Sequence, residues 1–245
     1  MAHMISFIIP AYNEELLLGR TLDALHRAAR SVDQPYEIIV ADDDSSDRTG
    51  SVAAEHGAAV VHTANRQIAA TRNAGARTAK GDWLFFVDAD TLVSDELLTE
   101  AVAALADGAA GGGAAFRFDE PVPLYGKILQ WVVRPVYRLG KIASGSFIFC
   151  TREAFDQVGG FDETLYGSEE AVMSRALGRC GPFVVLRETV LTSGRRLRLN
   201  SFWSILGILF YLFLGGGRIT NRRAARLWYD GRRETTEEND RPDGS

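Results

Sequence analysis

Residues 83–90 read Trp-Leu-Phe-Phe-Val-Asp-Ala-Asp, which is an apolar run that ends in two acidic residues. Such a run, without alternating polar residues, is typical of a strand buried on both faces. Three similar runs precede it, Ile5–Ile9, Glu37–Ala41 and Ala58–His62. Because Trp83–Val87 is the most apolar of the four, we expect it at the centre of the sheet, with its aspartates deep in a crevice.

Helical patterns separate these runs. Leu18, Leu22, Leu25 and Ala29 recur at the spacing of one helix face. Alternating strands and helices with short connections form right-handed βαβ units. The sequence therefore predicts an α/β fold with a mostly parallel central sheet and helices on both faces.

The regular alternation ends near residue 108. We interpret Gly108–Gly113 as a linker or loose turn. Beyond it we predict a helix over about Pro121–Leu139, a strand over Ser146–Cys150 and a helix over about Ser168–Arg179. The polar tail Glu234–Ser245 lacks periodicity and is predicted to be disordered.

Composition and charge exclude several classes of protein. The 245 residues are 46% hydrophobic and 24% charged, which excludes a disordered, collagen-like or multi-span membrane protein. Residues 1–186 carry 16 Lys/Arg and 25 Asp/Glu, whereas residues 187–233 carry 10 Arg and two acids. An acidic body argues against nucleic acid as the main partner. Two cysteines and no metal-binding Cys pattern favour a reducing, cytoplasmic compartment.

Residues 202–214 form an apolar segment with arginines on both sides. Thirteen residues are too few to span a bilayer, which needs ~20. The segment suits a helix lying in the headgroup layer at the inner face of the cell membrane. A buried helix or a homodimer face explains it equally well, and the sequence leaves these alternatives open.

Acidic and polar residues follow three of the predicted strands, at 10–15, 42–47 and 88–90. Ligands of an open parallel sheet bind at the carboxyl ends of its strands. Each cluster alone is explained by helix caps and turns. Their joint placement is not, because like charges brought together need a cation or a donor-rich ligand.

Asp88 and Asp90 are the strongest candidates for a metal site. On an extended backbone, residues two apart point to the same side. One carboxylate would then hold Mg²⁺ or Mn²⁺, and the other would bond a hydroxyl or a metal-bound water. Hard divalent cations prefer such oxygen ligands and leave positions for diphosphate oxygens.

Several polar residues remain ambiguous on pattern alone. Arg72 faces a nucleobase or phosphate, or lies on a helix surface, and by itself the surface arginine is favoured. Asn73 would tie a loop. Ser144–Ser146 forms a loop beneath a sugar or a plain turn, and Arg195 and Arg196 meet an anion or solvent.

Taken in order, these motifs resemble the family 2 glycosyltransferases of the GT-A fold over roughly residues 5–197. The resemblance rests on the following stretches: Ile8–Glu15, Asp42–Asp47 with Thr49, Arg72–Gly75, Ala79–Asp82, Asp88–Asp90, Val158–Glu163, and Glu169-Glu170 with Arg175. It implies an inverting enzyme that uses a UDP- or GDP-linked sugar and a Mn²⁺ or Mg²⁺ cofactor.

The resemblance also implies roles for individual residues. Pro10, Tyr12 and Glu14 would line the nucleotide pocket, and Asp43 would accept a hydrogen bond from the base with Arg72 beside it. Asp88 would lie near the ribose and sugar, and Asp90 would bind the metal. The sequence departs from the family pattern at Asp44, which replaces a glycine.

Glu169 and Glu170 stand where the family commonly has Glu-Asp, and the second carboxylate would be the general base. A plain alternative is favourable charge at a helix N-terminus. Adjacent helical residues point about 100° apart, so only one of the two faces the acceptor. A metal-binding histidine that some relatives add late in the domain has no counterpart here.

We therefore expect a glycosyltransferase domain over residues 4–197. Its nucleotide-sugar half is about 4–115 and its acceptor half 116–197, followed by an apolar, basic helical extension over 198–233. A sugar-1-phosphate nucleotidyltransferase is disfavoured because Asn13-Glu14-Glu15 replaces a Gly-rich basic loop. A nicotinamide dehydrogenase lacks its GxGxxG. A non-catalytic sugar-nucleotide-binding or membrane scaffold remains an alternative.

Overall fold

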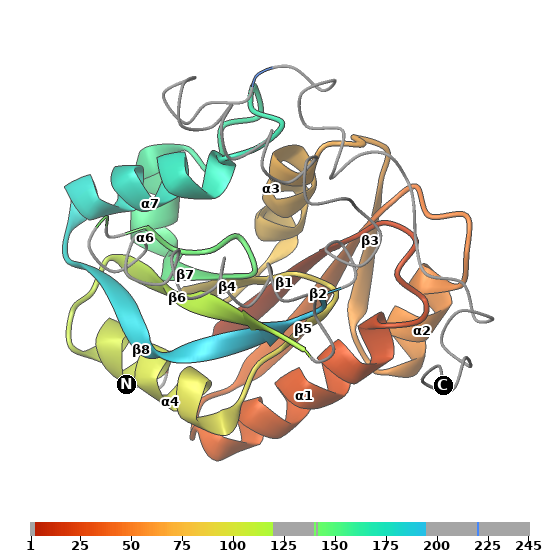
Figure 1. Ribbon diagram of the computed structural model, residues 1–245, viewed down its shortest axis with the longest axis horizontal. Coiled ribbons are helices and arrows are strands. Elements are labelled where there is room, and N and C mark those ends of the chain that lie inside the picture. Colours follow the sequence, from red (N-terminus) through yellow and green to blue (C-terminus); the bar gives the residue numbers. More distant parts are fainter. Residues whose placement is uncertain (1–2, 120–139, 141, 195–219, 221–245) are drawn as a thin grey trace, which may run out of the picture.

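The computed structural model describes residues 3–119, 140, 142–194 and 220 (Figure 1). Its helices are α1 (Leu18–Ser31), α2 (Thr49–Glu55), α3 (Ile68–Thr78), α4 (Asp95–Ala106), α6 (Arg152–Val158) and α7 (Glu169–Cys180). Its strands are β1 (Ile5–Ala11), β2 (Tyr36–Asp43), β3 (Ala59–Thr63), β4 (Trp83–Val87), β5 (Thr91–Leu92), β6 (Gly111–Phe118), β7 (Phe147–Thr151) and β8 (Phe183–Thr192).

Several predicted features lie outside the described residues. They are the helix over Pro121–Leu139, the pair Arg195 and Arg196, the apolar segment 202–214 within the extension 198–233, and the tail Glu234–Ser245. Among the helices that are described, none combines the length and the apolar character needed to cross a membrane.

One mixed sheet organises the described part of the chain, in the order β3-β2-β1-β4-β7-β6-β8-β5. β3, β2, β1 and β4 are parallel, as predicted. β7 runs antiparallel to both β4 and β6, and β8 runs parallel to β6. β4 therefore lies inside the sheet with all five residues buried, which confirms the central position expected for Trp83–Val87.

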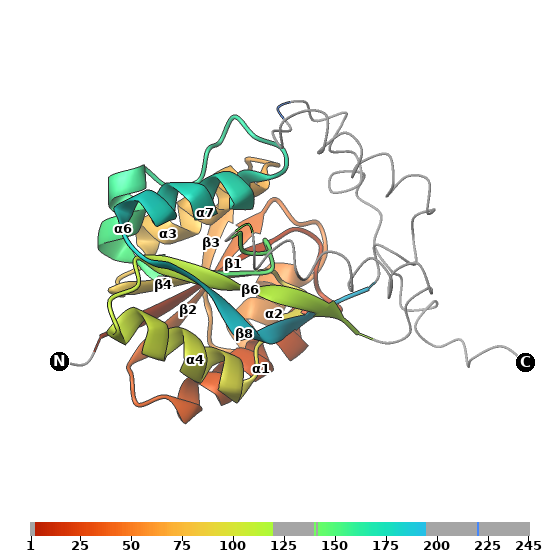
Figure 2. The ribbon, with the colours of Figure 1, turned by 60° about the vertical axis from the view of Figure 1, so that its left-hand side comes forward.

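Helices cover both faces of the sheet (Figure 2). Successive strand residues point to opposite faces. Phe7 and Phe85 pack into the core shared with α1 and α4. Ile8 and Phe86 pack into the core on the α3, α6 and α7 side. This explains why both faces of β1 and β4 are apolar, and it confirms the predicted α/β fold class.

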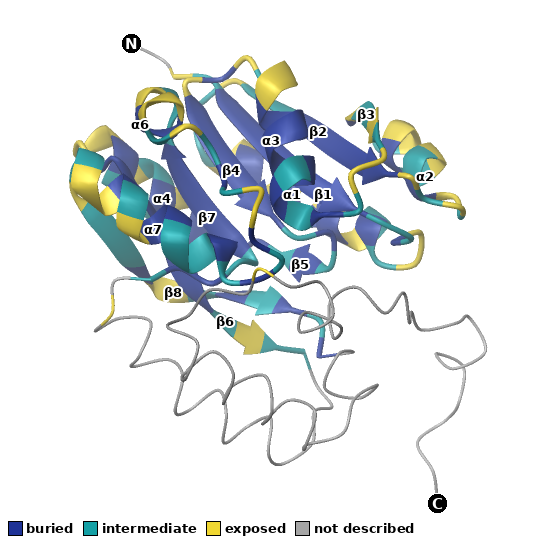
Figure 3. Ribbon diagram, turned by 90° about the horizontal axis from the view of Figure 1, so that it is seen from above, coloured by how far each residue is buried: buried dark blue, intermediate teal, exposed yellow. Residues whose placement is uncertain are grey.

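β3 is the exception among the predicted buried strands. Its residues are exposed or half-buried, because it is the edge strand and pairs only with β2 among the described strands (Figure 3). The expectation that Ala58–His62 is buried on both faces is therefore wrong. An edge strand needs only a partial apolar cover.

The glycines at 111–113 form the start of β6, so the interpretation of Gly108–Gly113 as a linker or loose turn is wrong for these three. They are required by close packing. A Cβ on Gly112 would lie 2.3 Å from the Val184 carbonyl oxygen and 2.4 Å from the Phe149 ring. A Cβ on Gly113 would lie 2.3 Å from the Ala143 Cβ. Only glycine lets these strands and the 143–146 loop approach so closely.

Candidate active site

The loops after β1 and β2 are joined to each other at the carboxyl edge of the sheet. Ala11 and Asp42 are register partners, so the two chains leave the sheet side by side. The Asn13 amide donates to Ser45 Oγ at 2.9 Å, and the Ser46 amide donates to Asn13 Oδ1 at 2.8 Å. Two of the three predicted acidic clusters therefore form one interlocked rim.

Asp44 has a left-handed backbone, with φ of 65°, and Asn13 has φ of 52°. Asp and Asn are the non-glycine residues that adopt this conformation most readily. Asp44 therefore adopts a backbone conformation that glycine adopts freely. The Ser45 amide donates to Asp42 Oδ1 at 3.2 Å and closes the turn.

The Asp43 carboxylate is buried and shapes the next loop. Its Oδ1 accepts hydrogen bonds from Thr63 Oγ1, the Asn65 amide and the Arg66 amide at 3.0, 2.7 and 3.0 Å. Its Oδ2 accepts one from the Gln67 amide at 3.2 Å. These bonds fix residues 63–67 against the end of β2.

That loop brings Arg66 over the ring of Tyr12, with its guanidinium carbon 4.0 Å from the ring centroid. Arg66 Nε also lies 3.9 Å from Asp44 Oδ2. Pro10 is buried in β1, and the buried Glu14 donates its amide to Thr49 Oγ1 at 2.7 Å. The residues expected around a nucleotide thus gather at the rim between β1 and β2.

Arg72 is buried in α3, with a side chain only 1% exposed, so the interpretation as a surface arginine is wrong. Its Nη1 donates to Glu169 Oε1 at 2.8 Å, and its Nη2 donates to Asp88 Oδ1 and to the Gly145 carbonyl, both at 2.9 Å. Its guanidinium also lies over the Phe161 ring. The structure therefore places Arg72 against Asp88 and Glu169, not against the Asp43 carboxylate.

Glu169 and Glu170 both lie in the first turn of α7 but have different surroundings. Glu169 is buried on Arg72, whereas Glu170 is half-buried, and its Cδ would lie 3.7 Å from a Cβ placed on Gly145. Burial, followed by repulsion from Glu169, raises the pKa of Glu170 to about 8. Burial opposes the charge of Arg72, but Asp88, Glu169 and Glu170 outweigh it and raise the pKa of Arg72. The Arg72 guanidinium thus stays charged beside the Glu170 carboxyl, which takes up a proton more easily than an ordinary glutamate.

Asp88 and Asp90 diverge, contrary to the expectation that both point to the same side. Residues 88–91 form a turn, closed by the Thr91 amide on the Asp88 carbonyl at 3.2 Å, so the backbone is not extended there. The Asp88 carboxylate meets Arg72, whereas Asp90 Oδ1 accepts a 3.4 Å hydrogen bond from Thr192 Oγ1. The two carboxylates therefore contact different elements, Asp88 the helix α3 and Asp90 the end of β8.

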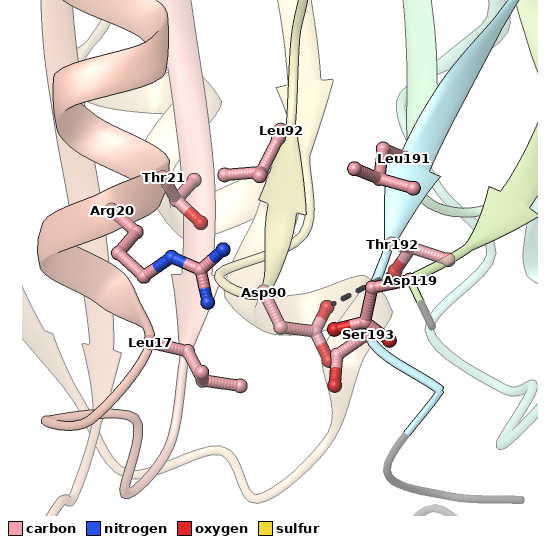
Figure 4. Close-up of a pocket in the computed structure, with 9 residues that line it drawn as sticks. All are labelled: Leu17, Arg20, Thr21, Asp90, Leu92, Asp119, Leu191, Thr192 and Ser193. Atoms are coloured by element: carbon pink, nitrogen blue, oxygen red, sulfur yellow. Dashed lines mark hydrogen bonds between the residues drawn. The ribbon is translucent and has the colours of Figure 1, made fainter. Parts of the chain in front are cut away.

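Asp90 lines a small pocket between α1 and the end of β8 (Figure 4). The pocket is lined by Leu17, Arg20, Thr21, Asp90, Leu92, Asp119, Leu191, Thr192 and Ser193. Asp119 was not predicted from the sequence. Its only local signal is its place after the apolar end of β6, and Gly194 donates its amide to Asp119 Oδ1 at 2.6 Å.

The pocket's donor atoms fit a hard divalent cation, since Asp90, Asp119, Thr192 and Ser193 all offer oxygen. Within the described ranges, no three His, Cys, Asp or Glu side chains come together as a metal site. A metal held by one or two carboxylates depends on substrate phosphates and water for its remaining ligands. A Mn²⁺ or Mg²⁺ site at Asp90 therefore stays a prediction, with which these oxygen donors are compatible.

α3 also fixes the loop that precedes α7. Asn73 Nδ2 donates to the Phe161 carbonyl and to Glu163 Oε1, both at 2.9 Å, and the Phe161 amide returns a bond to Asn73 Oδ1 at 2.9 Å. Gln67 Nε2 donates to the Leu165 carbonyl. Asn73 is therefore the predicted loop tie, and it joins α3 to residues 161–163.

Comparison with known proteins agrees with this architecture. Residues 6–159 match the profile of glycosyl transferase family 2. The uncharacterised glycosyltransferase EpsJ of Bacillus subtilis is 33% identical over 102 residues, which are 40% of this chain and 29% of EpsJ. Undecaprenyl-phosphate 4-deoxy-4-formamido-L-arabinose transferase of Proteus mirabilis is 31% identical over 111 residues, covering 42% of this chain and 34% of the relative.

A solved structure shows the same fold. The mannosyltransferase PcManGT of Pyrobaculum calidifontis, in complex with GDP-Man and Mn²⁺, aligns with a TM-score of 0.67 at 20% identity. The alignment covers 94% of this chain and 70% of that chain. The fold is that of a GT-A domain.

The chain belongs to glycosyl transferase family 2, since the matched residues make up more than half of it. It spans about a third of the length of the curated relatives named above. The resemblance seen in the sequence is thereby confirmed at the level of family and fold.

Proposed function

We propose that this domain transfers a sugar from a UDP- or GDP-linked donor to an acceptor hydroxyl, with inversion at the anomeric carbon. The observation that carries the proposal is the bridge made by Arg72. It joins Asp88, which directly follows β4, to Glu169, the neighbour of Glu170. The carboxylates of Asp88, on the proposed donor side, and Glu169, on the proposed acceptor side, are thus held in one hydrogen-bonded cluster.

The donor nucleotide occupies the rim between β1 and β2 in this proposal. Tyr12 and Arg66 supply an aromatic face and a cation there, and Pro10 and Glu14 form the wall. Asp43 acts mainly by shaping the 63–67 loop, with its remaining acceptor capacity available to the base. Asp88, held by Arg72, faces the ribose and sugar.

Asp90 and Asp119, with the Thr192 and Ser193 hydroxyls, would hold the divalent ion. When bound, Mn²⁺ or Mg²⁺ supplies positive charge next to the diphosphate. Because Asp88 Oδ1 is engaged by Arg72, we assign the metal to Asp90 rather than to both aspartates. The GDP-Man and Mn²⁺ complex of the mannosyltransferase supports a divalent cofactor.

Glu170 is the proposed general base. Its half-buried carboxyl and raised pKa suit a group that accepts a proton near neutral pH. The acceptor oxygen forms a bond to the anomeric carbon as the bond to the diphosphate oxygen breaks. That bond's electron pair leaves with the nucleoside diphosphate, and the acceptor proton passes to Glu170.

A lipid-linked or membrane-proximal acceptor is the finer part of the proposal. It rests on the apolar, arginine-flanked segment 202–214 of the sequence and on the undecaprenyl-phosphate named for the Proteus relative. Liposome flotation of the full chain and of a chain ending at residue 198 tests it. Binding that survives the truncation contradicts this role for the segment.

The transferase proposal itself is tested by thermal shift with nucleotide sugars and Mn²⁺, followed by an assay for hydrolysis of the nucleotide sugar that stabilises most. A bound ligand raises the melting temperature by mass action. Stabilisation together with slow, metal-dependent hydrolysis supports an enzyme. Stabilisation without turnover favours the non-catalytic scaffold, and no stabilisation by any nucleotide sugar contradicts both.

A further inference from the structure

The burial of the charged Arg72 side chain costs free energy. Arg72 is buried, and its Nε is a buried donor without a hydrogen-bond partner among the described residues. Burying a charged group costs several kcal/mol before its partners offset it, and apolar residues of similar volume often replace buried ion pairs without loss of stability. Packing alone therefore does not explain an arginine here.

The three acceptors of Arg72 come from three separate segments. Asp88 follows β4, the Gly145 carbonyl belongs to the loop before β7, and Glu169 begins α7. The fork of a guanidinium is the side chain geometry that can donate to all three at once. A lysine ammonium keeps the charge but lacks the planar fork.

We propose that Arg72 is a positioning residue that couples the two halves of the site. Its guanidinium holds Asp88 on the donor side and Glu169 on the acceptor side, and so fixes where the Glu170 carboxyl stands relative to the sugar. This inference rests on the proposed function and replaces the direct nucleotide contact expected for Arg72. It assigns Glu169 a positioning role as well.

The surroundings of Glu170 support this coupling. Among the residues that the structure describes, the charged groups that act on its carboxyl are Glu169 on its own helix and Arg72 on α3, and the Gly145 loop packed against it contributes backbone. Arg72 lowers the pKa of Glu170, and Glu169 raises it. Removing either one must therefore shift the titration of Glu170, in opposite directions.

The test compares Arg72→Lys, Arg72→Met, Glu169→Gln and the double variant R72K/E169Q. Asn73→Ala is the matched control, because it also removes buried ties from α3 to the acceptor half but touches neither Asp88 nor Glu169. The probes are hydrolysis of GDP-mannose or UDP-N-acetylglucosamine with Mn²⁺, whichever the wild type turns over, and calorimetry with the matching nucleoside diphosphate.

We expect each single variant at Arg72 or Glu169 to lower kcat by about 10- to 100-fold, the range that follows from misplaced catalytic groups. The double variant should lose no more than about threefold beyond the worse single one, because both act in one unit. The acid limb of the pH–rate profile should move upward in Arg72→Met and downward in Glu169→Gln. In Asn73→Ala the limb should stay in place although the melting temperature falls.

The inference is overturned if the kcat losses of Arg72→Lys and Glu169→Gln add up in the double variant. It is also overturned if Asn73→Ala loses as much kcat as Arg72→Lys at the same fall in melting temperature. A wild-type kcat in Arg72→Lys overturns it too. Should Arg72→Met not fold, Arg72→Lys and Glu169→Gln decide the matter alone. Failure of the wild type to bind or hydrolyse any nucleotide sugar would instead contradict the proposed function.

Discussion

Arg72 Nη1 lies 2.8 Å from Glu169 Oε1, although 97 residues separate them in the sequence. The contact joins α3 to the first turn of α7. Glu169 is buried in its ion pair with Arg72, so Glu170 is the one of the two adjacent glutamates that remains partly exposed. This difference in accessibility supports our proposal of Glu170, rather than Glu169, as the base.

Replacing Glu170 by Gln should leave nucleotide binding within a fewfold of wild type and lower the transfer or hydrolysis rate by about 10²–10⁴-fold, the usual contribution of a general base. Calorimetry and steady-state kinetics measure the two effects. Glu153→Gln is the control, since Glu153 is an exposed carboxylate in the first turn of α6. A Glu170→Gln enzyme with a near wild-type rate would move the role of base to Glu169 or another group.

The pH dependence of the reaction should follow Glu170. A base must be ionised, so kcat should rise with pH and level off above about 8, the raised pKa of this carboxyl. A rate measured from pH 5.5 to 9.5 with a stable reference substrate shows the limb. A rate that is flat across this range would contradict a base with a raised pKa.

The stability of the folded protein should fall with rising pH, whereas kcat should rise. The pKa of Glu170 is about 8 in the folded protein, above its ordinary value of 4.5. The stability that the protonated carboxyl contributes to the folded state is therefore fully present below pH 4.5 and is lost as pH rises through about 8. Glu170→Gln removes this loss. The variant should therefore gain melting temperature over wild type at pH 8.5 more than at pH 5.5. An equal difference at both pH values would contradict the assignment.

Gly112→Ala should destabilise the domain by about 1–3 kcal/mol or more, since the added Cβ overpacks β6 against Val184 and Phe149. Gly178→Ala is the matched control, and it should stabilise the domain. Its Cβ would make only an ordinary 3.7 Å contact with Phe183, and alanine is favoured over glycine inside a helix by about 0.5–1 kcal/mol. Chemical denaturation of both variants checks the pair, and a neutral Gly112→Ala would contradict the packing argument.

Asp43→Asn should loosen the 63–67 loop, because the amide nitrogen that replaces one carboxylate oxygen cannot accept a hydrogen bond. If Oδ1 stays an oxygen, the Gln67 amide loses its acceptor; if Oδ2 does, the donors from Thr63, Asn65 and Arg66 lose theirs. Leaving buried donors unpaired costs about 1–3 kcal/mol each. We expect a lower melting temperature and faster amide exchange at residues 65–67. Asp107→Asn, an exposed change, serves as the control. Weaker nucleotide binding without faster exchange would favour a direct contact with the base.

The strand–helix order of the first half was predictable from the sequence because its signals are local. The apolar runs that became β1, β2 and β4, and the periodic face of α1, need no distant partner to be recognised. The acidic residues were predictable for a similar reason, since the carboxyl ends of parallel strands share one edge.

What the sequence did not reveal depends on contacts between distant segments. Gly111–Gly113 resembles a loop because no neighbouring residue in the sequence indicates that the Phe149 ring and the Ala143 loop pack against it. Arg72 resembles a surface residue because its acceptors lie 16, 73 and 97 positions away. Asp119 joins Asp90 only through the pairing of β6 with β8 and of β8 with β5.

The central claim is that Asp90 holds a divalent ion carrying the diphosphate of a nucleotide sugar. Calorimetric titration of wild type and Asp90→Asn with UDP and GDP, each with Mn²⁺ and with EDTA, tests it most directly. We predict that wild type binds one of the nucleotides at least about tenfold more tightly with Mn²⁺, a difference of about 1.4 kcal/mol. Asp90→Asn should lose this gain and keep the weaker, metal-independent binding. Equal Mn²⁺-dependent binding in the two proteins would contradict the claim.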